Sequence, residues 1–188
     1  MRQLTLIVQT SLDGFVAGPN GEFDNFIEGE ENLGFVCSIT DEADAILLGR
    51  ISYQLINSHW PTAANKHGAT ENEIKYSTWY NYVPKYVLSK TLKTNTATNT
   101  YVIQENIESE INNLKQQPGK NILMFGSPTA VQSLFDLNLI DSFWIIVHPV
   151  FFGEGISFFR RKNITKLRLL ASKQLSNGTL CNKYAINK

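Results

Sequence analysis

Two short segments most constrain what this chain can fold into, because each runs from an apolar stretch through a glycine and a hydroxyl residue into a helical pattern. They are Leu47-Leu48-Gly49-Arg50-Ile51-Ser52-Tyr53 and Met124-Phe125-Gly126-Ser127-Pro128. A buried strand that turns sharply into a helix leaves the first N–H groups of that helix unpaired, and with the helix dipole these donors form an anion site. Two such sites suit the phosphate backbone of a dinucleotide. The alternative is that Ser127 only caps a helix whose first position is Pro128.

The bulk properties indicate a single domain over residues 1–188, with 43% hydrophobic residues. Lys+Arg and Asp+Glu are both 17, so the chain offers no net charge to attract nucleic acid or an anionic membrane. The densest basic run, 160–162, is expected to be a solvated turn.

Cys37 and Cys181 share no metal-type spacing with the histidines and are expected to be buried thiols in a reducing compartment. No secretory signal is recognisable, and no stretch reaches the about 18 apolar residues that span a bilayer, so a cytoplasmic protein is predicted.

Apolar periodicity predicts strands that alternate with helices through most of the chain. The expected strands cover 4–9, 45–48, 85–88, 100–104, 121–125 and 142–147. The expected helices cover 32–44, 71–82 and 128–137, with one from 51 that stops before His59-Trp60-Pro61 and one from 107 that ends at Pro118-Gly119. A final hairpin pairs 166–175 with 179–186 across Ser176-Asn177-Gly178. The predicted fold class is α/β, with a mostly parallel central sheet flanked by helices and an antiparallel C-terminal hairpin.

A series of motifs in a fixed order makes this pattern specific. The first strand is followed by Thr10-Ser11-Leu12-Asp13-Gly14-Phe15-Val16-Ala17-Gly18, which is not a G-x-G-x-x-G turn, so a Rossmann site is excluded there. That loop is followed by Leu47-Leu48-Gly49-Arg50, Val87-Leu88-Ser89-Lys90, Phe125-Gly126-Ser127 and 148–155. Over residues 3–186 the series resembles the dihydrofolate-reductase-like family that includes the C-terminal reductase domain of the bifunctional riboflavin-biosynthesis enzyme RibD, here in stand-alone form. The deaminase motifs of that enzyme are absent.

The resemblance implies that NADPH binds at the carboxyl ends of the strands. It assigns contacts with the phosphates to Gly49, Arg50, Ile51 and Ser52, and with the pyrophosphate to Gly126 and Ser127. It places the 2′-phosphate at Ser89 and Lys90, where a cation beside a hydroxyl is a sensible clamp, and it counts Leu88 among the cofactor-binding residues. The backbone of Val16 and Ala17 would lie against the nicotinamide carboxamide.

The resemblance further implies a reductase that transfers a hydride to a small heterocycle, similar to 5-amino-6-(5-phosphoribosylamino)uracil or to a pterin. Asp13 is the candidate catalytic acid, which would orient the substrate or supply a proton; the alternative is that it stabilises the bend at 12–14. A non-catalytic nucleotide-binding domain and a dihydrofolate reductase proper are the other functions considered. Members of the family commonly form homodimers, and the aromatic residues at 151, 152, 158 and 159 are expected to lie in the core or at such an interface.

Overall fold

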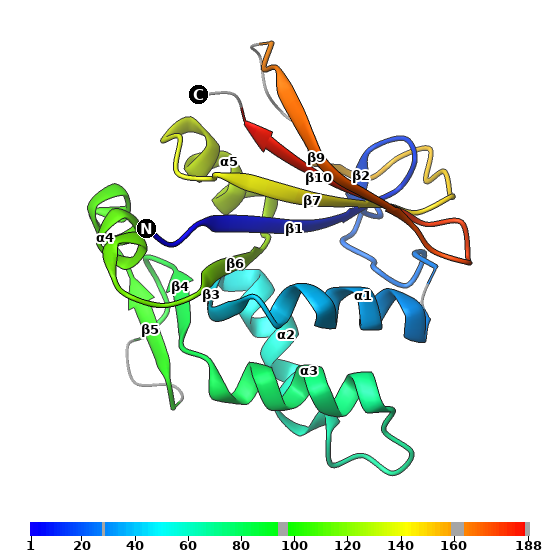
Figure 1. Cartoon of the computed structure of the whole chain (residues 1–188), viewed down its shortest axis with the longest axis horizontal. Helices are drawn as coiled ribbons and strands as arrows, with labels where there is room; N and C mark the ends of the chain where they lie inside the picture. The colour runs from blue at the N-terminus through cyan, green and yellow to red at the C-terminus, as the bar shows by residue number, and fades with distance from the viewer. Residues whose placement is uncertain (28, 94–97, 159–163, 187–188) are drawn as a thin grey trace.

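A computed structural model of the protein describes residues 1–27, 29–93, 98–158 and 164–186 (Figure 1). In chain order the elements are β1 (Leu4–Thr10), β2 (Phe15–Ala17), α1 (Glu30–Thr40), β3 (Ala43–Gly49), α2 (Arg50–Ala63), α3 (Glu71–Tyr82), β4 (Lys85–Leu88), β5 (Thr100–Ile103), α4 (Ile107–Gln116), β6 (Asn121–Phe125), α5 (Pro128–Asp136), β7 (Ser142–Val147), β8 (Ile156–Ser157), β9 (Leu167–Gln174) and β10 (Leu180–Ile186). The basic run 160–162 and Phe159 lie outside the described residues.

An eight-stranded sheet has the order β5-β4-β3-β6-β1-β7-β10-β9. The strands from β5 to β7 are parallel to one another, and β10 and β9 continue the sheet as the predicted antiparallel hairpin. The predicted fold class is therefore confirmed. Strand β2 pairs with β8 in a separate two-stranded sheet, which the sequence pattern did not reveal because both strands are very short.

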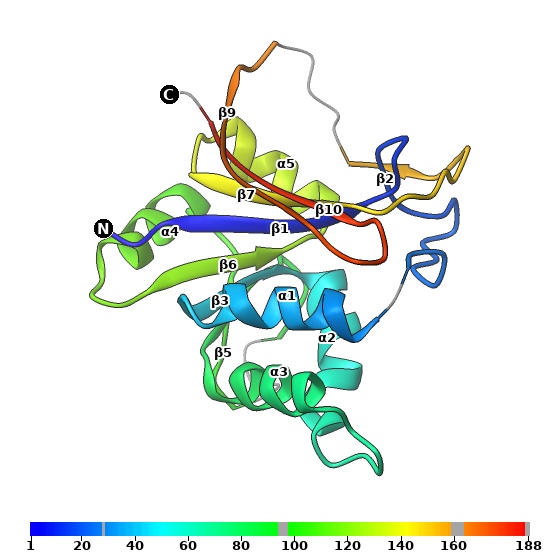
Figure 2. The same ribbon diagram turned by 45° about the vertical axis from the view of Figure 1, so that its right-hand side comes forward.

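Helices cover both faces of the sheet (Figure 2). On one face, side chains of α4 and α5 such as Ile111 and Leu134 pack with Leu4 and Leu6 of β1 in one apolar cluster. On the other face, α1, α2 and α3 pack against the alternate residues of the strands, as Ile46 does with the buried Tyr53 and Tyr80. This division follows from the strand geometry, since successive side chains point to opposite faces.

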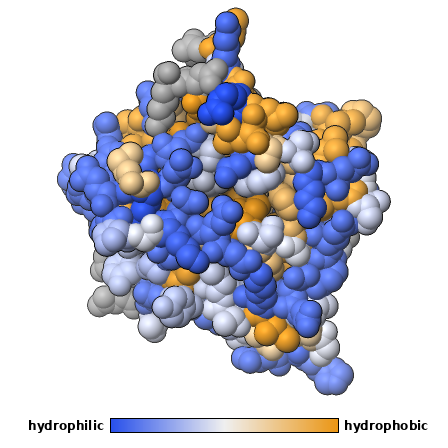
Figure 3. Space-filling view, viewed as in Figure 1, coloured by the Kyte–Doolittle hydropathy of each residue, from blue (hydrophilic) through white to orange (hydrophobic). Residues whose placement is uncertain are grey.

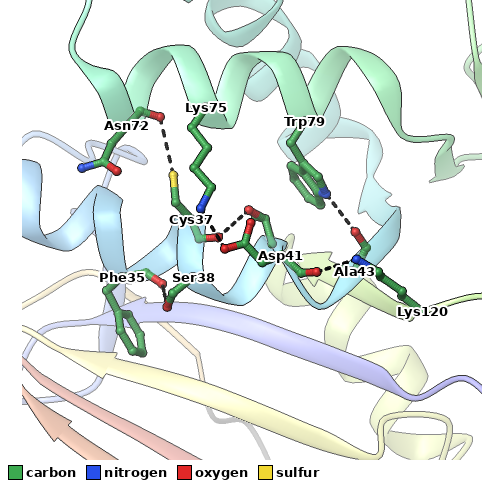
Figure 4. Close-up of polar contacts among 10 residues, drawn as sticks. Phe35, Cys37, Ser38, Asp41, Ala43, Asn72, Lys75, Trp79 and Lys120 are labelled. Carbon is green, nitrogen blue, oxygen red and sulfur yellow. Dashed lines mark hydrogen bonds and ion pairs between the residues drawn. The ribbon is translucent and has the colours of Figure 1, made fainter.

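The seam between α1 and α3 is held by polar contacts as well as by packing (Figure 4). Lys75 Nζ lies 2.7 Å from Asp41 Oδ2, and the Trp79 indole N–H donates to the Ala43 carbonyl at 2.9 Å. The thiol of Cys37 is buried in this seam, and burial raises its pKa. Cys37 and Cys181 are both free and buried, as predicted, and they are therefore packing residues.

The prediction that α2 stops before His59 is wrong, since the helix continues through Pro61 to Ala63. The continuation is explained by α3, which packs against this last turn. The Ser77 hydroxyl donates to the Trp60 carbonyl at 2.7 Å, and the Asn81 amide donates to the Pro61 carbonyl at 3.0 Å. Side chains of α3 thus satisfy carbonyl groups near the proline, and they override the tendency of proline to end a helix.

The first predicted helix, over 32–44, also differs in extent, because α1 ends at Thr40 and Ala43 already belongs to β3. Ala43 pairs with Asn121 of β6, so the chain from Ala43 onward belongs to the parallel sheet and not to the helix. Helix α3 agrees with the prediction and begins with a capping box between Thr70 and Glu73. No helix in the described ranges is both long and apolar enough to cross a bilayer.

Strand β9 forms the far edge of the sheet, and it carries three leucines together with Arg168 and Lys173. Every residue of β9 is exposed, and Leu167, Leu169 and Leu170 of this strand are 43%, 54% and 42% exposed. Figure 3 shows hydrophobic atoms interspersed with hydrophilic ones in the upper part of the molecule, where β9 and β10 lie. Of the aromatic residues in 151–158, Phe158 is in the core, whereas Phe151 is 72% exposed.

Candidate functional site

The two glycine turns singled out in the sequence meet in the structure. Strands β3 and β6 are parallel neighbours, and the helices that follow them, α2 and α5, lie on opposite faces of the sheet. The Gly49 N–H donates to the Gly126 carbonyl at 3.1 Å, which joins the two turns directly. In open parallel sheets a crevice forms where successive helices diverge in this way, and ligands bind there.

The turns approach each other too closely to admit side chains at the glycines. A Cβ added to Gly49 would lie 2.7 Å from Ser127 Oγ and 3.0 Å from the Ser127 amide nitrogen. A Cβ added to Gly126 would lie 3.0 Å from Ser52 Oγ, and Gly126 has a φ of +50°, which favours glycine. The peptide bond from Gly126 to Ser127 is cis. Both glycines are therefore required for the shape of this site.

The starts of both helices lack a side-chain cap. Gly49 and Ser127 occupy the N-cap positions of α2 and α5, and neither provides a capping hydrogen bond. Ser127 is the N-cap residue of α5 and Pro128 follows at its first position, as the alternative reading expected, but the Ser127 side chain makes no capping hydrogen bond. Ser52 in the first turn of α2 and Pro128 at the start of α5 line the same cleft, and the positive end of a helix dipole lies at each such start.

A cleft of about 450 Å³ adjoins these helix starts. Four of the predicted site residues line it: Val16, Ser52, Gly126 and Ser127. Most of the other lining side chains are apolar or aromatic. The described lining residues include no Asp, Glu, Lys or Arg, and the polar ones are Gln9, Ser52, Ser58, His59, Tyr76 and Ser127. Such a cleft suits a largely apolar ring that a few neutral groups orient.

Several residues of this cleft were missed from the sequence. Phe26 and Trp60 line it from the loop after β2 and from α2. Gln9 lines it from β1, where it is the one exposed residue of a strand whose other members are buried. A lone amide within the apolar run of the first strand was a signal that could have been used. His59 also lines the cleft, where its Nδ1 lies 3.2 Å from Lys66 Nζ.

Of the segment predicted to hold the 2′-phosphate, only Lys90 lines a second, open hollow among the described residues. Leu88 ends β4, and the Ser89 hydroxyl that follows accepts hydrogen bonds from the backbone N–H groups of 91 and 92. Lys90 is exposed and lines a hollow of about 710 Å³ at the start of α4. The carboxylates of Glu105 and Glu108 line the same hollow. A lysine charge is thus available there, although acidic groups surround it.

The remaining predicted residues lie at the start of α2 or in β2. Arg50 is exposed and donates to the Gln54 side chain at 3.1 Å, and Ile51 is 63% exposed. Ala17 is buried in β2, beside Val16. Among the described residues there is no group of three or more His, Cys, Asp or Glu that could hold a metal ion.

Asp13 is not part of the cleft lining, and it connects two loops instead. Its Oδ1 accepts from the Ser11 hydroxyl at 2.6 Å and from the Phe152 N–H at 3.2 Å, and its Oδ2 accepts from the Gly153 N–H at 2.8 Å. The hydrogen bond from Ser11, joined by those from Gly153 and Phe152, holds the pKa of this exposed carboxyl below its ordinary value. The Phe152 ring packs on Phe26 of the cleft wall, with centroids 4.9 Å apart. Asp13 therefore holds in place the loop whose Phe152 ring supports this wall.

Comparison with known proteins agrees with this geometry. The chain is 32% identical over 182 residues to the uncharacterized protein YyaP of Bacillus subtilis (strain 168), covering 95% of this chain and 92% of that protein. A putative riboflavin biosynthesis protein from Shewanella sp. PV-4 has the same fold, with a TM-score of 0.74, 18% identity and 99% of each chain covered. Dihydrofolate reductase from Enterococcus faecalis, solved in complex with NADP(H), also shares the fold, with a TM-score of 0.65 and 13% identity over 99% of this chain and 97% of that one.

The profile of the RibD C-terminal domain family matches residues 2–181, which is nearly the whole chain. The resemblance inferred from the motifs is therefore confirmed. This protein belongs to the RibD C-terminal domain family and has a dihydrofolate-reductase-like fold.

Proposed function

We propose that this protein is an NADPH-dependent reductase that transfers a hydride to a small heterocycle of the aminouracil or pterin type. Membership in the RibD C-terminal domain family supports reductase activity. The observation that carries the proposal is the pair of uncapped helix starts, which the bond from Gly49 to Gly126 joins beside an apolar cleft. This arrangement offers donors for a pyrophosphate and a dry space for two rings.

The residues present fit the cofactor. A side chain at Gly126 would meet Ser52 Oγ in this crevice, and the helix starts on either side are the kind of backbone that binds an anion. We assign the pyrophosphate to the helix starts at Gly49 and Ser127, and the 2′-phosphate to the segment 88–90. When bound, the dihydronicotinamide ring supplies the hydride. The aromatic walls at Phe26 and Trp60 exclude water from the reacting rings.

The first test is cofactor preference. We expect NADPH to bind about tenfold more tightly than NADH, because Lys90 adds a charge-assisted contact with the 2′-phosphate. This affinity ratio is at the low end of the range that one such contact usually gives, because Glu105 and Glu108 line the same hollow. Calorimetry with both dinucleotides measures the ratio, and Lys90→Ala is expected to bring it to unity. Lys166→Ala, an exposed lysine beside β9, is the matched control.

The second part of this test measures turnover with a panel of pterins and aminouracils. The loss of NADPH absorbance reports the rate. Oxidation of NADPH with one of these compounds supports the reductase. Tight NADPH binding with no turnover on the panel would instead support a nucleotide-binding domain without catalysis. Equal affinity for NADPH and NADH in the unmodified protein would contradict the assignment of Lys90.

We also propose a homodimer that forms through the exposed edge of the sheet. Strand β9 is an edge strand that exposes Leu167, Leu169 and Leu170, and an exposed edge offers its backbone groups for pairing with a second copy of the chain. Sedimentation equilibrium is expected to give twice the mass of the chain. Leu169→Glu is expected to give a monomer, and Ile74→Glu, at a 44% exposed apolar position on α3, is the control. A monomeric mass for the unmodified protein would rule the dimer out.

A further inference from the structure

Two apolar side chains lie where the cleft opens to solvent. Phe23, from the loop after β2, and Leu55 of α2 both line the cleft, and each remains 51% exposed. The walls further inside are covered, since Phe26 is 8% and Tyr76 is 4% exposed. Exposed apolar surface at the rim of a groove is typical of a place where a ligand binds. Phe23 and Leu55 together are called the apolar mouth below.

The place of Phe23 is determined by a turn whose other end is anchored. The Phe26 N–H donates to the Phe23 carbonyl at 3.4 Å. The Phe26 ring packs on the rings of His148 and Phe152, with centroids 4.8 Å and 4.9 Å apart. Because Phe26 is fixed in the cleft wall, the turn holds Phe23 beside it, at the exposed end of the cleft.

The face of α2 that lines the cleft gives the order of the groups along it. Ser52, Leu55, Ile56 and His59 line the cleft at helical spacing, so they share one face of the helix. Ser52 lies beside the glycine turn, where its Oγ would be 3.0 Å from a Cβ added to Gly126. Leu55 follows three residues later, which is about 5 Å along the helix axis. The apolar mouth is therefore about one helical turn from the proposed cofactor end of the cleft.

We propose that the apolar mouth is a subsite for an apolar substituent on the substrate ring, so that the substrate is a heterocycle with an uncharged apolar side group. This inference rests on the proposed function for the presence of the ring, and it adds the chemistry of the group that the ring carries.

The physical reason is the different cost of placing apolar and charged groups at this position. An apolar group against Phe23 and Leu55 removes exposed hydrocarbon from water, and the gain grows with the area that is covered. A phosphate or carboxylate in the same place would lose hydration and find no hydrogen-bond partner in these two side chains. Within the aminouracil and pterin class, the apolar mouth therefore selects against rings that carry a sugar phosphate at this position.

The first experiment uses two fluorescent probes that differ only in one sulfonate group, N-phenyl-1-naphthylamine and 8-anilino-1-naphthalenesulfonate. The unmodified protein is expected to bind the uncharged probe about tenfold more tightly. Because an uncharged probe prefers any apolar surface, the change of this ratio in matched variants is the decisive measurement. Leu55→Lys places an ammonium group at the mouth and is expected to bring the ratio to one or below. Ile74→Lys, at a 44% exposed position on α3 that does not line the cleft, is expected to keep it.

The second experiment asks whether the subsite holds a substituent of a ring. Pterin, 6-methylpterin and 6-carboxypterin are titrated by their own fluorescence against the protein alone and against the protein with saturating NADPH. We expect 6-methylpterin to bind about tenfold more tightly than 6-carboxypterin. Leu55→Lys is expected to reverse this preference and to leave the affinity for unsubstituted pterin unchanged, because that ring places nothing in the subsite.

A variant on the other side of the mouth provides an independent check. Phe23→Ser is expected to lower the affinity for 6-methylpterin about threefold and to leave that for pterin unchanged. Since Phe23 and Leu55 are half exposed, the variants at both positions are expected to fold, and thermal melting checks this.

The inference is overturned if Leu55→Lys leaves the ratio of the two naphthyl probes unchanged, or if Ile74→Lys changes it equally. It is also overturned if the unmodified protein binds 6-carboxypterin as tightly as 6-methylpterin, or if none of the three pterins binds.

The proposed function fails separately from this inference. If both probe ratios respond to Leu55→Lys but NADPH is never oxidised, the subsite stands and the reductase does not. If an aminouracil or a pterin supports oxidation of NADPH while the probe ratios ignore Leu55, the reductase stands and the subsite does not.

Discussion

Replacement of Gly126 by Val is expected to abolish NADPH binding, with at least a hundredfold loss of affinity. The branched side chain would meet Ser52 Oγ and occupy the crevice between the two helix starts. The pyrophosphate would lose its charge-assisted contacts with the backbone, each of which is typically worth about 1.5–3 kcal/mol. Calorimetric affinity for NADPH, measured beside thermal melting of the same variant, checks this result.

Because Gly126 has a positive φ, valine at this position also strains the backbone. A matched variant separates the effect of this strain on NADPH affinity from steric exclusion of the ligand. Gly68 has a φ of +79° and no neighbour within 4 Å of an added Cβ, so Gly68→Val carries similar strain away from the cleft. It is expected to lower the melting temperature and to leave NADPH affinity intact. A folded Gly126→Val variant that binds NADPH as strongly as the unmodified protein would show that this turn has no part in cofactor binding.

Asp13→Asn is expected to lower kcat/KM about a hundredfold while NADPH affinity stays unchanged. Both carboxylate oxygens accept backbone N–H groups, from Phe152 and Gly153, and an amide can satisfy only one of them. The Phe152 ring would lose its support and shift, and with it Phe26 in the cleft wall. A displacement of about 1 Å near reacting groups can cost a hundredfold in rate.

The pH profile separates this anchoring role from proton donation. The hydrogen bonds from Ser11, Gly153 and Phe152 hold the pKa of Asp13 below its ordinary value, which favours an anchoring role over proton donation. We therefore expect kcat/KM of Asp13→Asn to fall evenly at all pH values, with the shape of the profile kept. Glu22→Gln is the control, because this loop carboxylate accepts from Asn20 in a similar way but does not line the cleft. Loss of one limb of the profile in Asp13→Asn would instead identify Asp13 as a proton donor.

Much of this fold could be predicted because its signals are local. The strand at 121–125 and the helix from Pro128 followed from an apolar run, a glycine and a favoured first residue. The hairpin followed from Asn177-Gly178 between two β-rich segments. The two glycine turns could be singled out for the same reason, since strand, turn and helix start are contiguous in each.

The rest depends on contacts that no local pattern contains. The last turn of α2 exists because Ser77 and Asn81 of another helix hold it, so Pro61 was a misleading stop signal. Gln9 and His148 are 139 residues apart, and each alone is an ordinary polar residue at the end of a strand. Asp13 could be placed near the cleft, but its partners at 152 and 153 come from a distant loop. The sequence thus indicated the two glycine turns beside the cleft better than the side chains that line it.

The central place of β1 has a consequence for how the molecule is made. This strand is early in the chain, yet its neighbours in the sheet are β6, which begins at Asn121, and β7, which begins at Ser142. A growing chain that has not reached these residues holds Leu4, Leu6 and Ile7 without their partners. Contacts so distant in sequence slow folding and expose apolar surface to aggregation. The last half of synthesis, rather than the first, therefore decides whether the cleft forms at all.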